Sequence, residues 1–145
     1  MDEFTFSFAT SRDLEPVKQL LAECELPNED VDRHLGYFML ARSGEGLAGA
    51  VGLELLGTSG LFRSLAVRPE HRGKGLGTSL CHHMFTRARS SGIAKLYLLT
   101  QGAEGFFRKM NFTPIERKAA PPGIRATAEF RTLCPESATL MAKDL

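Results

Sequence analysis

The sequence predicts an α/β fold in which a mixed central β-sheet is flanked by helices. The first observation is a strand at 61–67 that runs into a glycine-rich turn and a following helix. A short apolar strand at 96–99 comes next, and a strand, a helix and a strand in this order imply a right-handed crossover between parallel strands. The third observation is a hairpin turn at 57–60, which pairs its two strands antiparallel. Parallel and antiparallel pairs together make the expected sheet mixed.

The N-terminal half is expected to alternate strands with helices. Phe4, Phe6 and Phe8 alternate with polar residues, which is the period of a half-buried strand. Thr10 offers an N-cap for a helix with one apolar face, and Pro27 ends this helix. Further along, the pattern predicts a helical patch at 31–35, a strand at 37–41, a turn at 43–46 and a strand at 47–56.

The C-terminal half continues the same alternation. The helix after the glycine-rich turn carries apolar residues three and four positions apart, and Ser91 and Gly92 end it. A length of 145 residues fits one hydrophobic core, so we expect a single domain over residues 1–145. Beyond the strand at 96–99, the pattern predicts a helix at 103–110, a strand at 112–116, a helix at 124–130 and a last strand at 139–142.

The composition is typical of a globular protein without a polymeric partner. Apolar residues make up 43% of the chain, charged residues 24%, and the formal net charge is +1. This balance excludes a strongly basic nucleic-acid binder and a disordered chain. The N-terminus lacks the basic and apolar regions of a signal peptide, and no apolar run approaches the ~20 residues that span a bilayer. We therefore expect a cytoplasmic protein with no nucleic-acid partner and no membrane partner.

Cysteines and histidines form no recognisable disulfide or metal pattern. Cys24, Cys81 and Cys134 include no Cys-x-x-Cys, which favours reduced thiols. Cys24 and Cys81 fall on apolar helix faces and are expected to be small core residues, whereas Cys134 precedes a proline and could be exposed. The four histidines have no ligand spacing with other metal-binding residues, so no metal is expected.

The glycine-rich turn has the features of a phosphate-binding loop. Gly73, Gly75 and Gly77 lack the Cβ atoms that would keep an anion away from backbone N–H groups, and the helix dipole adds partial positive charge. A pyrophosphate fits such a turn. The turn itself, Gly73-Lys74-Gly75-Leu76-Gly77, fits neither a dinucleotide-binding Gly-x-Gly-x-x-Gly nor a P-loop Gly-x-x-x-x-Gly-Lys-(Ser/Thr). The alternative is a tight turn without a ligand.

Two segments carry a resemblance to a known family. The first is Leu65-Ala66-Val67 followed by Arg72-Gly73-Lys74-Gly75-Leu76-Gly77, and the second runs over 100–112. They resemble the acetyl-CoA loop, (Arg or Gln)-x-x-Gly-x-(Gly or Ala), and the Asn-x-x-Ala-x-x-Phe-Tyr-x-Lys-x-Gly-Phe stretch of the GNAT superfamily of N-acetyltransferases. Thr100 stands where that superfamily usually has Asn. Phe107 stands where it often has the tyrosine that protonates the departing coenzyme A thiolate.

A narrower resemblance covers nearly the whole chain. It is carried by Val51-Gly52-Leu53-Glu54, by 61–67, by 96–100 and by a distinctive tail at 124–138. These segments are similar to a GNAT subfamily of arsenic-resistance N-acetyltransferases. Related enzymes acetylate the amine of amino acid analogues such as phosphinothricin or organoarsenicals. The resemblance therefore implies a small-molecule primary amine as the substrate, and a homodimer as the expected assembly.

The resemblance also implies how acetyl-CoA, the expected cosubstrate, is bound. Backbone N–H groups of 72–78 would hold the pyrophosphate, and strand backbone at Leu65 and Val67 would pair with the pantetheine arm. The Val67 N–H would receive the thioester oxygen as negative charge builds on it, a contact typically worth ~3 kcal/mol of barrier. The full cofactor-binding set expected is Leu65, Ala66, Val67, Arg72, Gly73, Lys74, Gly75, Leu76, Gly77, Thr78, Thr100 and Phe107.

Glu54 and Arg63 form a candidate site for the acceptor. A hairpin symmetric about residues 58–59 would set their side chains opposite each other on one sheet face. Arg63 also has the strand parity of Leu65 and Val67, which places the pair beside the acetyl group. A small zwitterion would put its acid group on Arg63 and its amine near Glu54, and Glu54 would remove the ammonium proton. An equally weighted alternative is a cross-strand ion pair that only fixes the sheet.

We therefore expect an N-acetyltransferase that moves the acetyl group directly from acetyl-CoA to an amine, with Glu54 and Val67 as catalytic residues and Arg63 and Glu54 as substrate-binding residues. A route through an acetylated Cys134 is an alternative. Because the usual Asn and Tyr are replaced, a catalytically silent acetyl-CoA-binding sensor is a further interpretation. A protein Nα-amine or lysine as acceptor would need a groove for an extended peptide.

Overall fold

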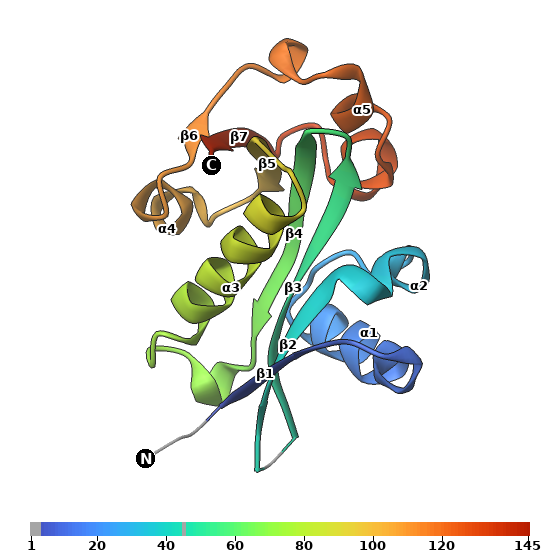
Figure 1. Cartoon of the computed structure of the whole chain (residues 1–145), viewed down its shortest axis with the longest axis vertical. Coiled ribbons are helices and arrows are strands. Elements are labelled where there is room, and N and C mark those ends of the chain that lie inside the picture. The colour runs from blue at the N-terminus through green and yellow to red at the C-terminus, as the bar shows by residue number, and fades with distance from the viewer. Residues whose placement is uncertain (1–3, 45) are drawn as a thin grey trace. The chain divides into compact units, whose positions relative to one another are not determined.

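A computed structural model describes residues 4–44 and 46–145 of the chain. Within these residues the chain forms a seven-stranded sheet in the order β1-β2-β3-β4-β5-β7-β6, with helices beside it (Figure 1). The β4–β5 pair is parallel and the β1–β2, β2–β3, β5–β7 and β6–β7 pairs are antiparallel. The predicted α/β class with a mixed sheet is confirmed. The strands are β1 Thr5–Phe8, β2 Phe38–Ser43, β3 Gly46–Leu56, β4 Ser59–Val67, β5 Lys95–Thr100, β6 Thr113–Pro114 and β7 Thr139–Asp144.

The described residues divide into two compact units. The first unit comprises the chain up to Leu53 together with Ser64–Thr86, and the second comprises Glu54–Arg63 together with Arg87–Leu145. Both β3 and β4 contribute residues to each unit. The single domain over residues 1–145 stays a prediction. The helices are α1 Leu14–Glu23, α2 Val31–His34, α3 Leu76–Ser90, α4 Glu104–Lys109 and α5 Pro122–Arg125, with 3₁₀ turns at Ser11–Asp13, Leu35–Tyr37, Pro69–His71 and Arg117–Ala119 and a π-helical segment at Glu129–Leu133.

In the first unit, helices cover both faces of the strands. Leu20 of α1 is fully buried in one cluster with Leu40 of β2 and Ala50 of β3. Gly49 points to the other face, because neighbouring strand residues alternate. A Cβ added to Gly49 would lie 2.9 Å from the Ala66 carbonyl oxygen, which requires glycine there, and 3.0 Å from a methyl carbon of Leu80 in α3. α1 and α3 therefore pack on opposite faces.

The first helix begins later than predicted: Thr10 precedes the 3₁₀ turn Ser11–Asp13, and α1 itself begins at Leu14. The Thr10 N–H donates to Oδ2 of Asp13 at 2.8 Å, and Arg42 Nη2 donates to Oδ1 of the same carboxylate at 2.7 Å. Burial alone would raise the pKa of Asp13, but these hydrogen bonds outweigh it and hold the pKa below its usual value. The ionised carboxylate thus ties the helix start to β2.

In the second unit, the parallel pair joins β4 to β5 in the register Ser59↔Lys95 to Leu61↔Tyr97. This pairing confirms the predicted parallel arrangement of the two strands. Among the described residues it ends at Leu61 and Tyr97, although β4 continues to Val67 and β5 to Thr100. The strands therefore part towards their carboxyl ends.

The two faces of the second unit have different cores. Leu61 packs with Ile124 of α5 and with Leu140 of β7 in one buried cluster. Phe62, the next residue of β4, turns the other way, and its ring lies 6.0 Å from that of Phe107 in α4. Arg63 follows Leu61 by two positions, so its side chain belongs to the face that the C-terminal tail covers.

Two C-terminal expectations are wrong. The helix predicted at 124–130 ends at Arg125, because the Thr127 hydroxyl donates to the Ile124 carbonyl at 2.7 Å and competes with the helical backbone pattern. The strand predicted at 112–116 shrinks to Thr113–Pro114, since proline cannot donate to a ladder. Glu45, in the turn predicted at 43–46, lies outside the described residues.

Candidate active site

The glycine-rich loop joins β4 to α3 in the first unit. Gly73 and Gly75 have φ angles of 79° and 78°, in the left-handed region that favours glycine. A Cβ added at either position would meet no described atom within 4 Å, so the space beside the loop is open. The first N–H groups of α3 have no acceptor within the helix. The predicted strand, glycine turn and helix are therefore present, with donors available for an anion.

Two arginine side chains fix the segment that leads into the loop. Arg72 Nε donates to the Val67 carbonyl at 3.0 Å. Arg68 Nε donates to the Leu47 carbonyl at 2.5 Å, and Arg68 Nη1 donates to Glu23 at 2.7 Å. Only the backbone of Arg72 could be assigned from the sequence, because no motif reveals a side chain that folds back onto a carbonyl. The end of β4 depends on both arginines.

The cysteines differ in surroundings. Cys24 Sγ lies 3.7 Å from the Val67 carbonyl and 3.6 Å from Arg72 Nη2, so Cys24 is part of the loop's support and more than a core residue. Cys81 is buried as predicted, and burial raises the pKa of its thiol to about 12. Cys134 is half-buried, so its side chain is less exposed to solvent than its position before a proline led us to expect.

Arg63 lies between two carboxylates in the second unit. Arg63 Nη1 donates to Glu54 Oε2 at 2.8 Å, and Arg63 Nη2 lies 3.4 Å from Glu129 Oε2. The three residues are 2%, 6% and 4% exposed, respectively. The predicted pairing of Glu54 with Arg63 is confirmed. Glu129 was missed, because an acidic residue in a C-terminal tail carries no sign of which strand it meets.

The hairpin that holds this pair differs in detail from the prediction. The turn residues are Gly57 and Thr58, one position earlier than expected, so a regular register makes Glu54 and Arg63 diagonal neighbours on one face. Ser64 has a φ of 60°, which interrupts the alternation of β4. The expectation that the Arg63 side chain lies on the same strand face as those of Leu65 and Val67, which rested on an unbroken alternation, is therefore wrong.

Thr100 and Phe107 have structural surroundings of their own in the second unit. Thr100 is half-buried at the end of β5 and pairs with Thr139 of β7. Phe107 is 7% exposed, and its ring contacts the rings of Phe62, Phe106 and Phe112. This burial fits the core role expected of Phe107. A contact of either residue with a coenzyme stays a prediction.

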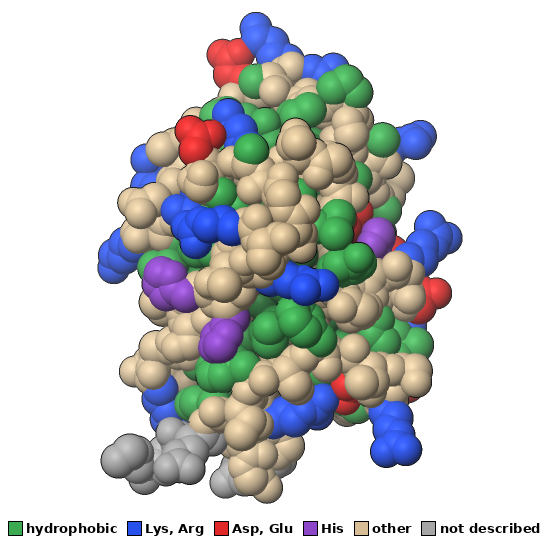
Figure 2. Space-filling view, viewed as in Figure 1, with side chains coloured by type: hydrophobic (Ala, Val, Ile, Leu, Met, Phe, Trp, Pro, Cys, Tyr) green, Lys and Arg blue, Asp and Glu red, His purple; other side chains and the backbone are tan. Residues whose placement is uncertain are grey.

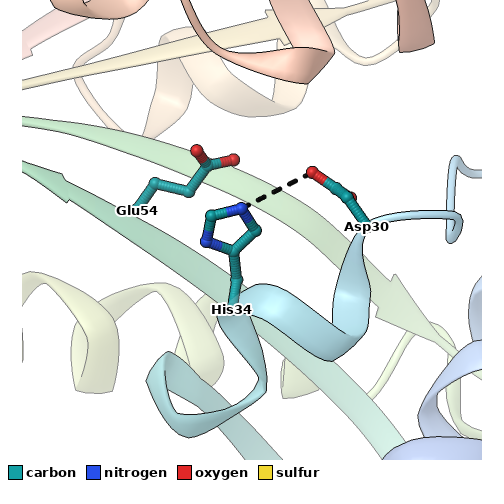
Figure 3. A group of neighbouring side chains, drawn as sticks. All are labelled: Asp30, His34 and Glu54. Atoms are coloured by element: carbon teal, nitrogen blue, oxygen red, sulfur yellow. Dashed lines mark ion pairs between the residues drawn. The ribbon is translucent and has the colours of Figure 1, made fainter.

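One histidine has an acidic neighbour. His34 Nε2 lies 3.6 Å from Asp30 Oδ2, four residues earlier in the first unit (Figure 3). Asp30 and His34 are thus one helical turn apart, and the expectation that no histidine has ligand spacing with another metal-binding residue is wrong for His34. The absence of a metal site stays a prediction.

Charged side chains are spread over the face of the described residues that Figure 2 draws. Lys and Arg side chains are scattered there among other residues. Among the same residues, no helix is both long and apolar enough to cross a membrane.

Comparison with known proteins identifies the family. The model of the acetyltransferase (GNAT) family matches residues 2–112. The chain belongs to this family. The predicted superfamily is thereby confirmed, whereas the arsenic-resistance subfamily stays a prediction.

Curated relatives of this GNAT chain include amino-acid acetyltransferases. The chain is 41% identical over 73 residues to the one from Pseudomonas syringae pv. tomato, which is 50% of this chain and 17% of that protein. It is also 31% identical to the enzyme from Escherichia coli over 83 residues, and this matched stretch covers 57% of this chain and 18% of that protein. The chain thus spans less than a fifth of the length of these relatives.

Solved structures confirm the GNAT fold. N-acetylglutamate synthase from Neisseria gonorrhoeae, complexed with coenzyme A and N-acetyl-glutamate, superposes with a TM-score of 0.86 at 21% identity over 99% of this chain and 35% of that one. Rv2747 from Mycobacterium tuberculosis, in complex with CoA, gives a TM-score of 0.80 at 22% identity over 97% of this chain and 99% of that one. At these identities the likeness concerns the fold.

Proposed function

We propose that this chain is an acetyl-CoA-dependent N-acetyltransferase whose acceptor is the primary amine of a small, amino-acid-like molecule. The observation that carries the proposal is the pair of left-handed glycines, Gly73 and Gly75, beside open space at the start of α3 in a chain of the GNAT family. The amino-acid acetyltransferase relatives and the synthase structure with coenzyme A support the donor and the class of acceptor.

The loop fits the donor. Backbone N–H groups of 72–78 would hold its pyrophosphate, and β4 backbone at 65–67 would pair with its pantetheine arm, while Thr100 and Phe107 would line it. When bound, acetyl-CoA supplies an activated thioester. The Val67 N–H would stabilise the oxyanion that develops on the thioester oxygen, a contact typically worth ~3 kcal/mol. Arg72 supports this role, since its side chain holds the Val67 carbonyl in place.

Glu54 is the proposed general base. An amine reaches the site as an ammonium, and Glu54 would remove one proton, directly or through water, to give the neutral nucleophile. The nitrogen lone pair then forms the C–N bond, the C–S bond breaks, and its electron pair leaves on sulfur. The proton that the new amide nitrogen must still lose passes to the thiolate or to water. A thiol has a pKa near 8.5, so the thiolate can leave without an acid at position 107.

Arg63 takes a different role from the one first expected. The Arg63 side chain is 0% exposed and lies between two carboxylates. We therefore assign Arg63 the role of positioning Glu54, and not the expected role of binding the acid group of the acceptor. A phosphinothricin-like or arsenical acceptor is a finer proposal, and it rests on the resemblance of the sequence segments alone. A homodimer and a cytoplasmic location rest on the resemblance and on composition.

The test is thiol release from acetyl-CoA with a panel of acceptors. The panel holds amino acids including glutamate, phosphinothricin-like and arsenical amino acids, aminoglycosides, polyamines and peptides. We expect turnover on one small amino-acid-like amine, with no product when the amine is N-acetylated beforehand. Tight binding of acetyl-CoA without turnover on any acceptor would favour the second candidate, a sensor, whose supporting observation is the hydroxyl-free Phe107 among core rings.

A further inference from the structure

We propose that Glu129 is a positioning residue for Glu54 and acts through the Arg63 guanidinium that both carboxylates share. The inference rests on the proposed function and deepens it, because it names a second acid in the acceptor site.

The geometry of the guanidinium supports this role. Arg63 Nη1 binds Glu54 at 2.8 Å and Arg63 Nη2 faces Glu129 at 3.4 Å, so each terminal nitrogen has its own carboxylate. A guanidinium is planar, and two partners on its two terminal nitrogens fix the plane. Without Glu129 the group could turn about its stem and carry the Glu54 carboxylate with it.

Burial strengthens the coupling between the three groups. All three residues are at least nine-tenths buried, and Arg63 lies within ion-pair distance of both carboxylates. Charges that water does not screen interact strongly, so a change at Glu129 is expected to reach Glu54 through the guanidinium between them.

The backbone of the tail is arranged to bury Glu129. Glu129 begins the π-helical segment Glu129–Leu133, and such segments are frequent at functional sites. The Glu129 carbonyl accepts the Cys134 N–H at 2.9 Å, which closes the segment. Arg131, two residues on, is exposed. The carboxylate of Glu129 is therefore held inward by the local fold.

The experiment is a double-mutant cycle on the full chain with the best acceptor of the panel. Glu129→Gln removes the charge and keeps the shape, and we expect kcat with the amine to fall about 10- to 100-fold while the KM for acetyl-CoA is unchanged. Arg63→Met removes the guanidinium that lies between the two acids and lowers kcat further. In the Arg63→Met background, adding Glu129→Gln is expected to raise kcat several-fold, because it relieves the repulsion between two neighbouring carboxylates.

Two controls complete the cycle. Glu136→Gln, an exposed acid of the same tail, is expected to keep kcat within about twofold. Glu129→Asp keeps the charge on a shorter side chain and is expected to recover part of the kcat that Glu129→Gln loses. If thermal unfolding shows that Glu129→Gln does not fold, Glu129→Asp takes its place in the comparison with the wild type. The inference is overturned if Glu129→Gln keeps wild-type kcat, or if it lowers kcat in the Arg63→Met background too. A wild type without turnover overturns the proposed function and this inference together.

Discussion

The glycine loop at 72–78 and the buried group of Glu54, Arg63 and Glu129 solve different chemical problems. Residues 72–75 of the loop are exposed, and the loop offers backbone N–H groups, with Gly73 and Gly75 in the left-handed region. The buried group offers side chains whose charges are fixed by one another. A phosphate can be held by backbone that tolerates many side chains. Moving a proton, by contrast, requires particular side chains at fixed positions.

The largest expected effect concerns the buried group. Glu54→Gln keeps the shape and removes the base, so kcat is expected to fall at least ~100-fold, the usual contribution of general base catalysis. Thiol release with saturating acceptor measures it, and isothermal titration is expected to show unchanged acetyl-CoA affinity. Retained kcat together with a raised KM for the amine would contradict the role as a base and leave only a binding role.

A smaller effect is expected in the loop. Gly75→Ala places an alanine in a left-handed backbone conformation, which costs about 1–2 kcal/mol of stability. The added methyl group also enters the space assigned to the pyrophosphate. We expect the Kd for acetyl-CoA to rise about tenfold, with kcat at saturation nearly unchanged. Calorimetric titration measures the Kd.

Gly105→Ala is the matched control for the loop variant. Gly105 lies in α4, an added Cβ there also meets open space, and its φ is not positive. This variant is expected to leave the Kd unchanged and to raise stability by roughly 0.5–1 kcal/mol. If both alanine variants bind acetyl-CoA as the wild type does, the loop is a tight turn and no phosphate site.

The two regions also differ in how far the sequence predicts them. The loop could be predicted because its glycines, the preceding strand and the following helix are neighbours in the chain. The pair of Glu54 and Arg63 could be predicted because a short hairpin joins them. Glu129 could not, since its place depends on how the Thr127 hydroxyl ends a helix and on the π segment that follows. The bend at Ser64 was missed because serine seldom adopts a φ of 60°.

The next prediction tests whether a side chain supports the backbone of the loop. Arg72→Ala removes the hydrogen bond to the Val67 carbonyl, and a loss of about 1 kcal/mol corresponds to a roughly fivefold higher Kd for acetyl-CoA. Alkylation of Cys24 is expected to accelerate, because Arg72 no longer contacts its sulfur. Cys81 serves as the internal control: with a pKa of about 12 it stays unreactive at pH 8. Unchanged binding and alkylation would show that the arginine side chain is dispensable.

The smallest effect is expected at Phe107, where the buried aromatic core meets the chemistry. Phe107→Tyr restores the hydroxyl that resemblance led us to expect, but the ring is 7% exposed among the rings of Phe62, Phe106 and Phe112. A hydroxyl without a partner there costs about 1–3 kcal/mol, so thermal stability should fall. We expect kcat to stay within about threefold, because a thiolate with a pKa near 8.5 leaves without an acid. A tenfold rise in kcat would instead show that protonation of the leaving group limits the rate and that position 107 reaches the sulfur. In that case the aromatic core of the second unit would belong to the catalytic machinery, and the contrast between exposed backbone and buried charges would no longer describe the whole site.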